Sequence, residues 1–494
     1  MGYNFLAWIK LSKCHTAFDG ATQEQVKCCP PYSTAKVVDF VPPPSHEPLR
    51  VRQPAHKLEA EYVEKFKEGI ARMKALPADD PWNFMQQATI HYTYCNGAYD
   101  QVGFNEEVLL QVHGSWLFLP WHRYYLYFYE RIIGRLIGDP TFALPIWNWD
   151  TQEGMRIPKI YLDTSSPLYN DLRNKSHYTA LFDYKFAFGD PNPSPPQEEE
   201  VITHNLHILH KMFKESEKSP SLFMGKPVVA GEAVPSNASG SLENLHNDVH
   251  MWTGPSKSPY HDMGNFYTAA HDIMFFGHHA NVDKMWDIYN SSRGHTPEFK
   301  QDDWLEASFV FYDENRQVVK CKLQYSYQAE NLPWMSICRH YFRLRAAKKK
   351  KTRESASDTT VSDFGSEPRP LNEPIQVLVQ RTKISRSKDD KDEATEILVI
   401  DGIEVPHGVA ARFDVYVAKP IDGHVGTDMG ELAGSFVKIR HSHHKFHIKS
   451  HKSSFKLGIT TLLEDIEAEG SEKLVVTILP RIGEVTIGGV HIEL

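Results

Sequence analysis

The chain has 494 residues, 41% hydrophobic and 24% charged, which leaves room for two or three domains with sizeable cores. Its net charge of −9 argues against a nucleic-acid-binding protein, and no apolar run approaches the roughly 18 residues of a membrane span. Six cysteines are too few for a disulfide scaffold at this length. Three of them, Cys14, Cys28 and Cys29, fall close together, which indicates a local staple and an oxidising compartment.

The chain begins with a stretch that is expected to be extended. Prolines recur before residue 55, so an arm that wraps a core is predicted there. Residues 59–76 (EAEYVEKFKEGIARMKAL) then place apolar residues at helical spacing, which predicts an amphipathic helix. The short apolar patch at residues 5–9 is too short for a secretory signal and does not resemble a transit peptide.

Histidines recur in the first half of the chain in a setting that suits metal binding. His91 lies in IHYTYC, and residues 113–130 (HGSWLFLPWHRYYLYFYE) place His113 and His122 around the start of a helical stretch. Residues 146–150 (IWNWD) follow and are expected to pack inside the protein.

A second histidine region follows about a hundred residues later. His246 and His250 are four residues apart, which puts their Cβ atoms roughly 5–6 Å apart on one helical face. Residues 272–283 (DIMFFGHHANVD) predict another helix, in which Asp283 could orient an imidazole ring. Imidazole ligands without thiolate or carboxylate suit copper, zinc or iron.

Two stretches between and beyond these regions are expected to be peripheral. Residues 151–200 are polar and proline-rich, which predicts surface loops. Three histidines follow at three-residue spacing outside both motifs, so solvated or packing roles are expected for His204, His207 and His210.

The last part of the chain changes character twice. Residues 346–370 are basic and rich in Ser and Thr, which is linker composition. Beyond them, β-branched runs such as EILVIDGIEV and LVVTIL, separated by Gly, Asp and Pro, predict a small all-β domain. The histidines between 441 and 451 are expected on a polar strand face or loop.

The two histidine regions resemble the signatures of one family. Residues 113–130 fit H-x4-F-L-x-W-H-R-x2-L-x3-E, and residues 272–283 fit D-x2-F-F-x2-H-x3-D, in which His279 is the ligand of its pair. These patterns are typical of the type 3 copper proteins, which include tyrosinases, catechol oxidases and hemocyanins. The chain is most similar to plant polyphenol oxidases, including a D-W-L segment at 303–305 and R-F-D-V at 412–415 where the family has K-F-D-V.

This resemblance implies a mainly α fold: a four-helix-bundle dicopper catalytic domain followed by a small all-β C-terminal domain. It divides the chain into an N-terminal arm (1–55), a catalytic domain (56–345, with the D-W-L segment at about 295–345), a linker (346–372) and a C-terminal β domain (373–494). In plant members the β domain lies over the copper mouth. We therefore expect a latent protein that an activating protease, mild detergent or acid releases.

The resemblance also implies two copper ions, each held by three histidines. The first set is His91, His113 and His122, and the second set is His246, His250 and His279. A plastid location, in the thylakoid lumen, follows from the resemblance, although no transit peptide is recognisable.

The cysteines take further roles from the same resemblance. Cys95 and His113 correspond to two residues that plant members join by a thioether, which would fix the ring. Cys14 corresponds to the disulfide partner of Cys29. The partner expected for Cys28 is replaced by Tyr92, so Cys28 is expected to be a free thiol.

Four residues are implied to act on the substrate. Phe266 matches the aromatic residue that caps the second copper, and Asn247 and Met251 should line the substrate mouth. Glu243 is the candidate that, with Asn247, orients a water to deprotonate monophenols, but it lies one residue closer to His246 than is usual. We therefore expect oxidation of o-diphenols to o-quinones, with dioxygen reduced to water and at most weak monophenol hydroxylation.

Two alternatives use the same histidines. Reversible dioxygen binding without turnover, as in hemocyanins, needs the same six imidazoles, but the plant-type C-terminal segments weigh against it. A zinc hydrolase is disfavoured because no carboxylate stands in an HExxH-like position.

Overall fold

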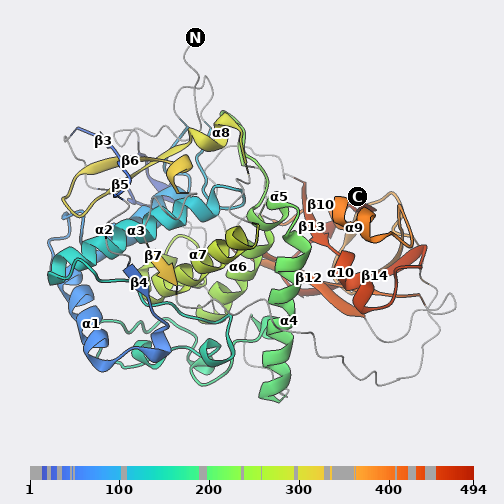
Figure 1. Cartoon of the computed structure of the whole chain (residues 1–494), viewed down its shortest axis with the longest axis horizontal. Helices are drawn as coiled ribbons and strands as arrows, with labels where there is room; N and C mark the ends of the chain where they lie inside the picture. The colour runs from blue at the N-terminus through green and yellow to red at the C-terminus, as the bar shows by residue number, and fades with distance from the viewer. Residues whose placement is uncertain are drawn as a thin grey trace, which may run out of the picture.

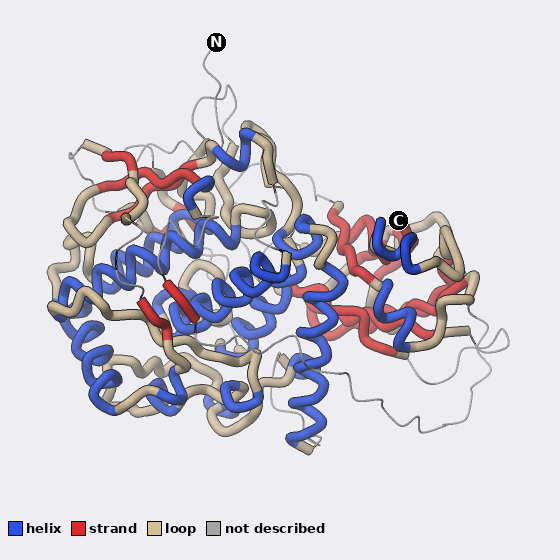
Figure 2. Tube along the Cα trace, viewed as in Figure 1, coloured by secondary structure: helices blue, strands red, loops and turns tan. Residues whose placement is uncertain are grey.

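A computed structural model of the chain describes the following residues: 14–18, 24–30, 36–44, 47, 50–101, 108–187, 197–234, 239–257, 259–293, 299–326, 334–336, 361, 363–406, 409–420, 430–439 and 452–494. Figures 1 and 2 show a helical domain on one side, a domain of strands on the other, and α4 between them.

Helices dominate the part of the chain before residue 306. They are α1 (Ala60–Ala75), α2 (Phe84–Cys95), α3 (Phe118–Ile137), α4 (Glu198–Ser216), α5 (Pro220–Met224), α6 (Ser241–Thr253), α7 (Met274–Ser292) and α8 (Asp302–Leu305). Strand pairs border them: β1 (Ala17–Phe18), β2 (Gln25–Val26), β3 (Val38–Asp39), β4 (Arg50–Arg52), β5 (Ser308–Tyr312), β6 (Val318–Lys322) and β7 (Trp334–Ser336).

The position of each helix follows from how its apolar residues are spread. In α1 the buried residues include Phe66, Ile70 and Met73, which lie on one face, so this helix covers the outside of α3 as predicted for residues 59–76. Helix α3 is apolar or aromatic around most of its circumference and is buried along nearly its whole length. It ends at Gly138, whose positive φ of 70° closes the last turn without a Cβ clash.

Buried ion pairs join the helices that carry the histidines. Arg52 donates to Glu130 on α3 (2.9 Å) and to Asp283 on α7 (3.0 Å), and Arg123 donates to the other Asp283 oxygen (2.5 Å). Asp283 therefore binds two guanidinium groups, and the expectation that it orients an imidazole is wrong. A carboxylate this deeply buried needs paired cations, because desolvation otherwise disfavours its charge.

The N-terminal arm is tied to the helical domain at several points. A disulfide joins Cys14 and Cys29, with Cα atoms 5.7 Å apart, while Cys28 is a buried free thiol. Strand β4 of the arm pairs in parallel with β7.

Residues 151–200 differ from the surface loops that were expected. Short 3-10 turns there bury Tyr161, Phe182 and Tyr184, and Arg173 pairs with Asp272 at the start of the α7 segment (2.6 Å). The polar composition misleads because this segment alternates exposed polar residues with isolated aromatic anchors.

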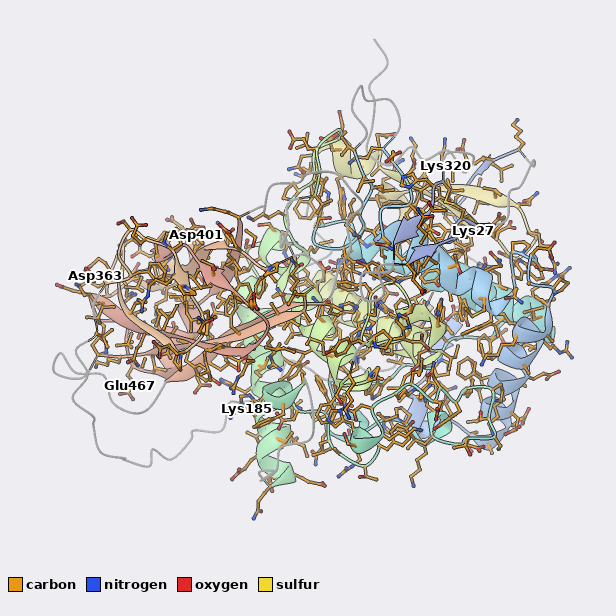
Figure 3. All side chains as sticks on the ribbon, turned by 180° about the vertical axis from the view of Figure 1, so that it is seen from behind. Lys27, Lys185, Lys320, Asp363, Asp401 and Glu467 are labelled. Carbon is orange, nitrogen blue, oxygen red and sulfur yellow. A yellow bond between two sulfur atoms is a disulfide. The ribbon has the colours of Figure 1, made fainter. Side chains whose placement is uncertain are left out.

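The C-terminal domain contains two packed antiparallel sheets. Their orders are β12-β11-β14-β9 and β13-β10-β16, and a small β15-β8 pair adjoins them. The strands are β8 (Arg369–Pro370), β9 (Ile375–Gln380), β10 (Ile397–Ile403), β11 (Ala411–Ala418), β12 (Glu431–Lys438), β13 (Ser453–Gly458), β14 (Lys473–Ile482), β15 (Thr486–Ile487) and β16 (Gly489–Glu493); α9 (Lys388–Glu393) and α10 (Thr460–Asp465) complete the domain. One apolar core draws on both sheets, and Figure 3 shows Asp363, Asp401 and Glu467 at its periphery.

Strand β8 begins at Arg369, and Leu371 packs into the core of the β domain. The β domain of the structure therefore includes residues before 373. Most of the expected linker (residues 346–360 and 362) lies outside the described residues, as do the histidines between 441 and 451. Among the described residues, no helix has the length and apolar character needed to cross a membrane.

The two domains meet along α4 and α6. Successive residues of β11 alternate, so that Phe413 and Val415 enter the β core while Arg412 and Asp414 face the helical domain. Strand β12 lies against α6, the helix that carries His246 and His250.

Candidate metal centre

The six histidines expected as ligands come together in one buried cavity. Four helices and one loop supply them: His91 on α2, His113 in the loop before α3, His122 on α3, His246 and His250 on α6, and His279 on α7. None is more than 2% exposed. The cavity therefore has no bulk water to stabilise a charge, and a bound cation would be held by the rings alone.

The second set has the spacing of a metal site. The Nε2 atom of His279 lies 3.1 Å from Nε2 of His246 and 3.4 Å from Nε2 of His250. Three imidazole nitrogens bound at about 2.0–2.1 Å to one ion lie roughly 3.3–3.5 Å apart. The two distances from His279 are thus close to those of a single-ion site, and the ligand atoms of His246, His250 and His279 all lie within 4.8 Å of one another.

Hydrogen bonds on the opposite ring nitrogens fix the tautomers that metal binding needs. Nδ1 of His122 donates to the Phe118 carbonyl (2.7 Å), and Nδ1 of His250 donates to the Met263 carbonyl (2.9 Å). Nδ1 of His246 likewise lies 3.0 Å from Oδ1 of Asn247. With the proton on Nδ1, each neutral ring keeps a lone pair on Nε2 for a metal.

The first set is as compact as the second. The ring centroids of His91, His113 and His122 are 5.1–5.4 Å apart in every pairing. The two sets adjoin, because the His122 ring stacks on His279 at 4.2 Å with an interplanar angle of 11°. Two metal ions held by these sets would share one cavity.

Burial keeps the rings neutral. Desolvation lowers the pKa of His122 to about 3 and that of His250 to about 4, and it also lowers the pKa values of His91, His246 and His279 well below the ordinary range. Phe118 and Phe275 pack against rings of both sets and leave a dry wall between the helices. A neutral imidazole is the form that binds copper.

His278 also lies within reach of the second set. One potential ligand atom on each of His246, His250, His278 and His279 lies within 4.8 Å of the others. However, Nε1 of Trp149 donates to Nδ1 of His278 (2.9 Å), and the His246 backbone carbonyl faces the same ring. A neutral ring that accepts at Nδ1 carries its proton on Nε2, so it offers no lone pair there.

Cys95 lies beside the first set. A potential ligand atom on each of His91, Cys95 and His113 lies within 4.8 Å of the others. Complete burial raises the pKa of the Cys95 thiol well above its usual range, so the thiolate needed for metal ligation is disfavoured.

Gln111 is a residue of the site that the sequence did not predict. Its Nε2 donates to the Cys95 carbonyl (2.6 Å), and its Oε1 accepts from the His113 amide (2.9 Å), so it holds these two residues together. Its only sequence signal is its place two residues before His113.

Glu243 and Asn247 both lie beside the histidines. The Glu243 carboxylate is 2% exposed and accepts from the Gly114 amide (2.8 Å), next to His113. Desolvation raises its pKa to about 8, against the lowering effect of the Gly114 bond. Asn247 donates through Nδ2 to the Val437 carbonyl of β12 (3.2 Å), a contact with the β domain that the sequence did not indicate.

Phe266 lies close to the histidines, and its ring contacts the first set. Its ring packs on His113 of the first set, with centroids 4.4 Å apart, because the irregular segment before α7 passes across both sets. Phe266 and Met251 share an apolar cluster with Val437 and Ile439 from the β domain, and both are nearly buried. Where the substrate mouth was expected, the β domain therefore covers the surface.

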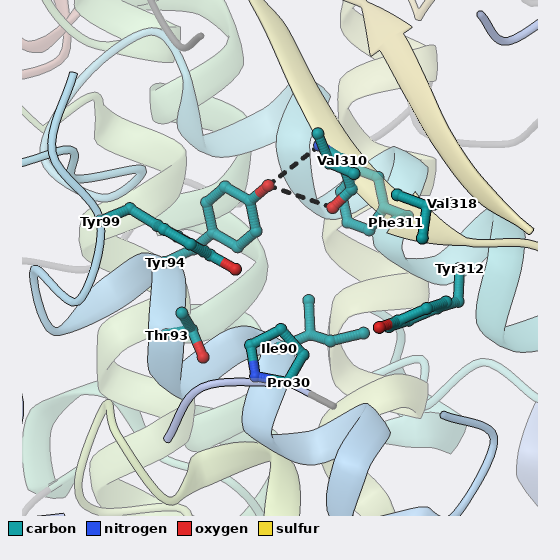
Figure 4. Close-up of a pocket in the computed structure, with 9 residues that line it drawn as sticks. All are labelled: Pro30, Ile90, Thr93, Tyr94, Tyr99, Val310, Phe311, Tyr312 and Val318. Atoms are coloured by element: carbon teal, nitrogen blue, oxygen red, sulfur yellow. Dashed lines mark hydrogen bonds between the residues drawn. The ribbon is translucent and has the colours of Figure 1, made fainter. Parts of the chain in front are cut away.

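A small pocket is lined by residues of α2, β5 and β6, together with Pro30 and Tyr99 (Figure 4). Its lining is mostly apolar, and the Tyr94 hydroxyl is hydrogen-bonded to the Val310 backbone there. It contains none of the six histidines. We assign it no role in the chemistry.

Three family patterns match successive parts of the chain. They are the common central domain of tyrosinase (residues 81–292), the polyphenol oxidase middle domain (298–338) and the chloroplastic polyphenol oxidase C-terminal domain (367–494). A chloroplastic polyphenol oxidase from Malus domestica is 44% identical over 98% of this chain and 83% of its own length. Aureusidin synthase from Antirrhinum majus is 40% identical over 92% of this chain and 82% of its own length.

Solved structures agree with these sequences. Latent apple tyrosinase is 42% identical with a TM-score of 0.82, and the match covers 93% of this chain and 99% of that one. Latent aurone synthase is 37% identical with a TM-score of 0.88, covering 98% and 97%. The two histidine sets, the helical domain and the β domain thus place the chain in the polyphenol oxidase branch of the tyrosinase family, whose members are dicopper oxidoreductases.

Proposed function

We propose that the protein oxidises o-diphenols to o-quinones, with two coppers bound by His91, His113, His122 and by His246, His250, His279. The observation that carries this proposal is the geometry of the second set, where Nε2 of His279 lies 3.1 and 3.4 Å from its two partners. The copper pair supplies electron transfer between the phenol and dioxygen when bound. Two diphenols each lose two electrons and two protons, and one dioxygen becomes two waters.

The protein side chains prepare this chemistry in three ways. Carbonyl and amide acceptors hold the Nδ1 protons of His122, His246 and His250, so their rings need no rotation as the metal changes charge. Phe118 and Phe275 exclude water from between the sets. A thioether between Cys95 and His113, which Gln111 holds together, would fix a further ring.

The named relatives leave the preferred phenol open. They include polyphenol oxidases, an aureusidin synthase and a (+)-larreatricin hydroxylase from Larrea tridentata. We favour diphenol over monophenol oxidation because Glu243 lies one residue closer to His246 than is usual in the family, and its Oε1 is engaged with the Gly114 amide. The relatives are named as enzymes, so we do not propose dioxygen carriage alone.

Metal analysis and turnover of the copper-loaded chain test this function. We expect two coppers per chain, no zinc requirement, and oxidation of catechol and dopamine far faster than hydroxylation of tyramine. One metal per chain, or diphenol oxidation that zinc supports, would contradict the dicopper assignment. Comparable rates on tyramine and dopamine would contradict the diphenol preference alone.

We also propose that the β domain keeps the enzyme latent until a protease cuts the tether between residues 346 and 370. The support lies in contacts over the second set. Val437 accepts from Asn247, and Val437 and Ile439 pack in one cluster with Met251 and Phe266. Relatives are described as latent forms, whereas an active aurone synthase structure matches only 66% of this chain.

Charged contacts beside the mouth support the same proposal. Arg412 lies 3.6 Å from Asp248 on α6 and 3.4 Å from Asp414 on its own strand, and it donates to the Tyr184 carbonyl. Farther away, Lys211 on α4 donates to the Leu432 carbonyl (2.8 Å). Interfaces with buried charges at their centre come apart when one partner is lost, because the other is left unpaired.

A plastid location is proposed from the relatives, several of which are named chloroplastic. Fractionation of the source tissue, with the protein detected by antibody beside a plastid marker, tests it. Recovery of the protein outside the plastid fraction would reject this location.

A further inference from the structure

Two successive residues of helix α2, His91 and Tyr92, contact the irregular segment around Phe266 and Tyr267, which precedes α7. The backbone of Phe266 faces the His91 ring, and the next residue on α2, Tyr92, places its ring against Tyr267. The two tyrosine ring centroids are 5.4 Å apart at an angle of 48°. Tyr92 and Tyr267 are 3% and 0% exposed.

The segment that Tyr92 contacts carries Phe266, whose ring packs against the first histidine set. Phe266 lies 4.4 Å from the His113 ring and shares its apolar cluster with Met251, Tyr92 and Tyr267. Hydrogen bonds hold the segment at Met263, whose carbonyl accepts from His250 Nδ1 (2.9 Å), and Tyr267 N donates locally to Asn265 Oδ1 (3.1 Å). The Phe266 and Tyr267 rings are positioned by packing, and the well-packed helix α2 is a rigid neighbour for them.

Tyr92 also joins this segment to the N-terminal arm. Cys28, a buried free thiol of the arm, belongs to the same cluster, and Thr93 donates to the Cys28 carbonyl (2.5 Å). No covalent bond links α2 to the arm at this point, since Cys28 is unpaired. The large Tyr92 side chain therefore connects the N-terminal arm, helix α2 and the segment that carries Phe266 through packing.

We propose that Tyr92 is a positioning residue that, through Tyr267, holds Phe266 over the histidines and thereby sets the affinity for ring-substituted diphenols. This inference rests on the proposed function. Tyr92 acts through the packing of Phe266 and takes no part in the oxidation step. Its removal should therefore change substrate binding more than the rate of the bound complex.

Three variants of the full chain distinguish the contribution of the Tyr92 ring from that of its hydroxyl, and test whether Tyr92 and Tyr267 act as a pair. Tyr92→Leu and Tyr267→Leu remove one ring each, and Tyr92→Phe keeps the ring. Tyr94→Leu is the matched control, because Tyr94 lies on the same helix but packs on Tyr99 and Trp121 and bonds the Val310 backbone at the small pocket (Figure 4). It also loses a buried aromatic side chain.

Copper content is measured first, and KM and kcat for 4-methylcatechol are then measured on the full chain and after limited trypsin treatment. We expect both Leu variants at 92 and 267 to keep two coppers and to raise KM about threefold to tenfold, the range for loss of one aromatic pair. The double variant should be no worse than the poorer single variant, because the pair acts as one unit. The calorimetric Kd of 4-methylbenzoate, which cannot be oxidised, should rise in parallel.

Tyr92→Phe should retain the wild-type KM, and Tyr94→Leu should lower thermal stability without changing KM. The proposal is overturned if Tyr92→Leu leaves both KM and the 4-methylbenzoate Kd unchanged, if Tyr92→Phe behaves like Tyr92→Leu, or if the two Leu effects add. If the wild-type protein oxidises no diphenol, the proposed function fails instead, whereas the Kd comparison still tests Tyr92.

Discussion

The two histidine sets are alike in ligands but differ in their surroundings. The first set lies inside the helical domain, where Gln111 binds both Cys95 and His113 and no described contact comes from the β domain except through Phe266. The second set lies on α6 and α7, and α6 is covered by β12. Asn247 and Asp248, which lie between His246 and His250 in the sequence, both contact the β domain.

This difference suggests different roles for the two sets. The first set is surrounded by fixed packing, which favours a constant geometry. The second set is the one that a departing β domain would uncover, so access and regulation should be controlled there. Variants in the second set or its cover should therefore change metal binding or latency, whereas variants beside the first set should change its rigidity.

The largest effect is expected from the adjacent histidines of α7. His279→Ala should remove the second copper and lower diphenol turnover by more than about a thousandfold, because electron transfer to dioxygen needs both ions. His278→Ala should retain two coppers and much of the activity, because the Trp149 bond leaves His278 no lone pair at Nε2. Copper per chain and catechol oxidation are the measurements. Equal copper loss in both variants would show that His278 is a ligand.

The next effect concerns the cover of the second set. Arg412→Met leaves Asp248 without its buried cation, whereas Asp414 keeps Arg481 (2.6 Å), and the loss at Asp248 weakens the closed arrangement. We expect the uncut chain to gain at least about tenfold in catechol oxidation, since 1.4 kcal/mol changes a population tenfold. Trypsin cutting of wild type should give a similar or larger gain at constant copper content.

Lys456→Met is the control for this variant. Lys456 pairs with Glu493 within the β domain and is partly exposed, so its loss costs at most about 1 kcal/mol and leaves the interface intact. A wild-type chain that is fully active before cutting would contradict latency. A gain in the Lys456→Met control equal to that of Arg412→Met would contradict the role of Arg412.

A smaller effect is expected at the first set. A peptide containing Cys95 should stay joined to one containing His113 after full reduction, with a mass two hydrogens below their sum. Cys95→Ala should keep both coppers but lower turnover by a few fold, because the His113 ring then loses its covalent anchor while Gln111 still binds only the His113 backbone amide. Separate peptides with full wild-type activity would show that no thioether is needed.

Much of this centre could be predicted from the sequence, because helical spacing fixes where side chains point. His246 and His250 lie one turn apart on α6, and α1 lies within the predicted residues 59–76. The change from linker composition to β-branched runs likewise marked the β domain. Each of these predictions depends on contacts within one element or on a long signature.

The errors arose where a contact joins distant parts of the chain. Asp283 binds Arg52, which is 231 residues away, so no local pattern could show that it does not orient an imidazole. The Gln111 and Trp149 bonds are similar, since neither residue type predicts its partner. Residues 151–200 were misjudged because a few buried aromatic side chains decide their position more than the polar majority.

The smallest predicted effect concerns pH, and for Glu215 it is opposite to the expectation that acid weakens the cover. Glu215 on α4 accepts from the backbone amides of Thr461 (2.7 Å) and Leu462 (3.1 Å), which begin α10 of the β domain. Burial raises the pKa of Glu215 in this closed state, although both amides and nearby Lys211 act to lower it. A carboxyl group with a higher pKa when covered takes up a proton on closing. Closure is therefore favoured as the pH falls. Between the ordinary pKa of glutamate and the raised pKa of Glu215, each increase in pH weakens closure, and above the raised pKa the weakening is complete.

Glu215→Gln isolates this contribution, because glutamine keeps the accepting oxygen but cannot ionise. The measurement is the ratio of catechol oxidation in uncut chain to that in trypsin-cut chain between pH 5 and 7, which cancels the pH dependence of catalysis itself. In wild type the ratio should fall toward acid pH by less than about tenfold, since one pKa unit corresponds to about 1.4 kcal/mol. In Glu215→Gln the ratio should be flatter, with latency retained at pH 7. A ratio that rises toward acid pH in wild type would show that other groups at the interface outweigh Glu215. An identical slope in both proteins would show that Glu215 does not control the cover at all.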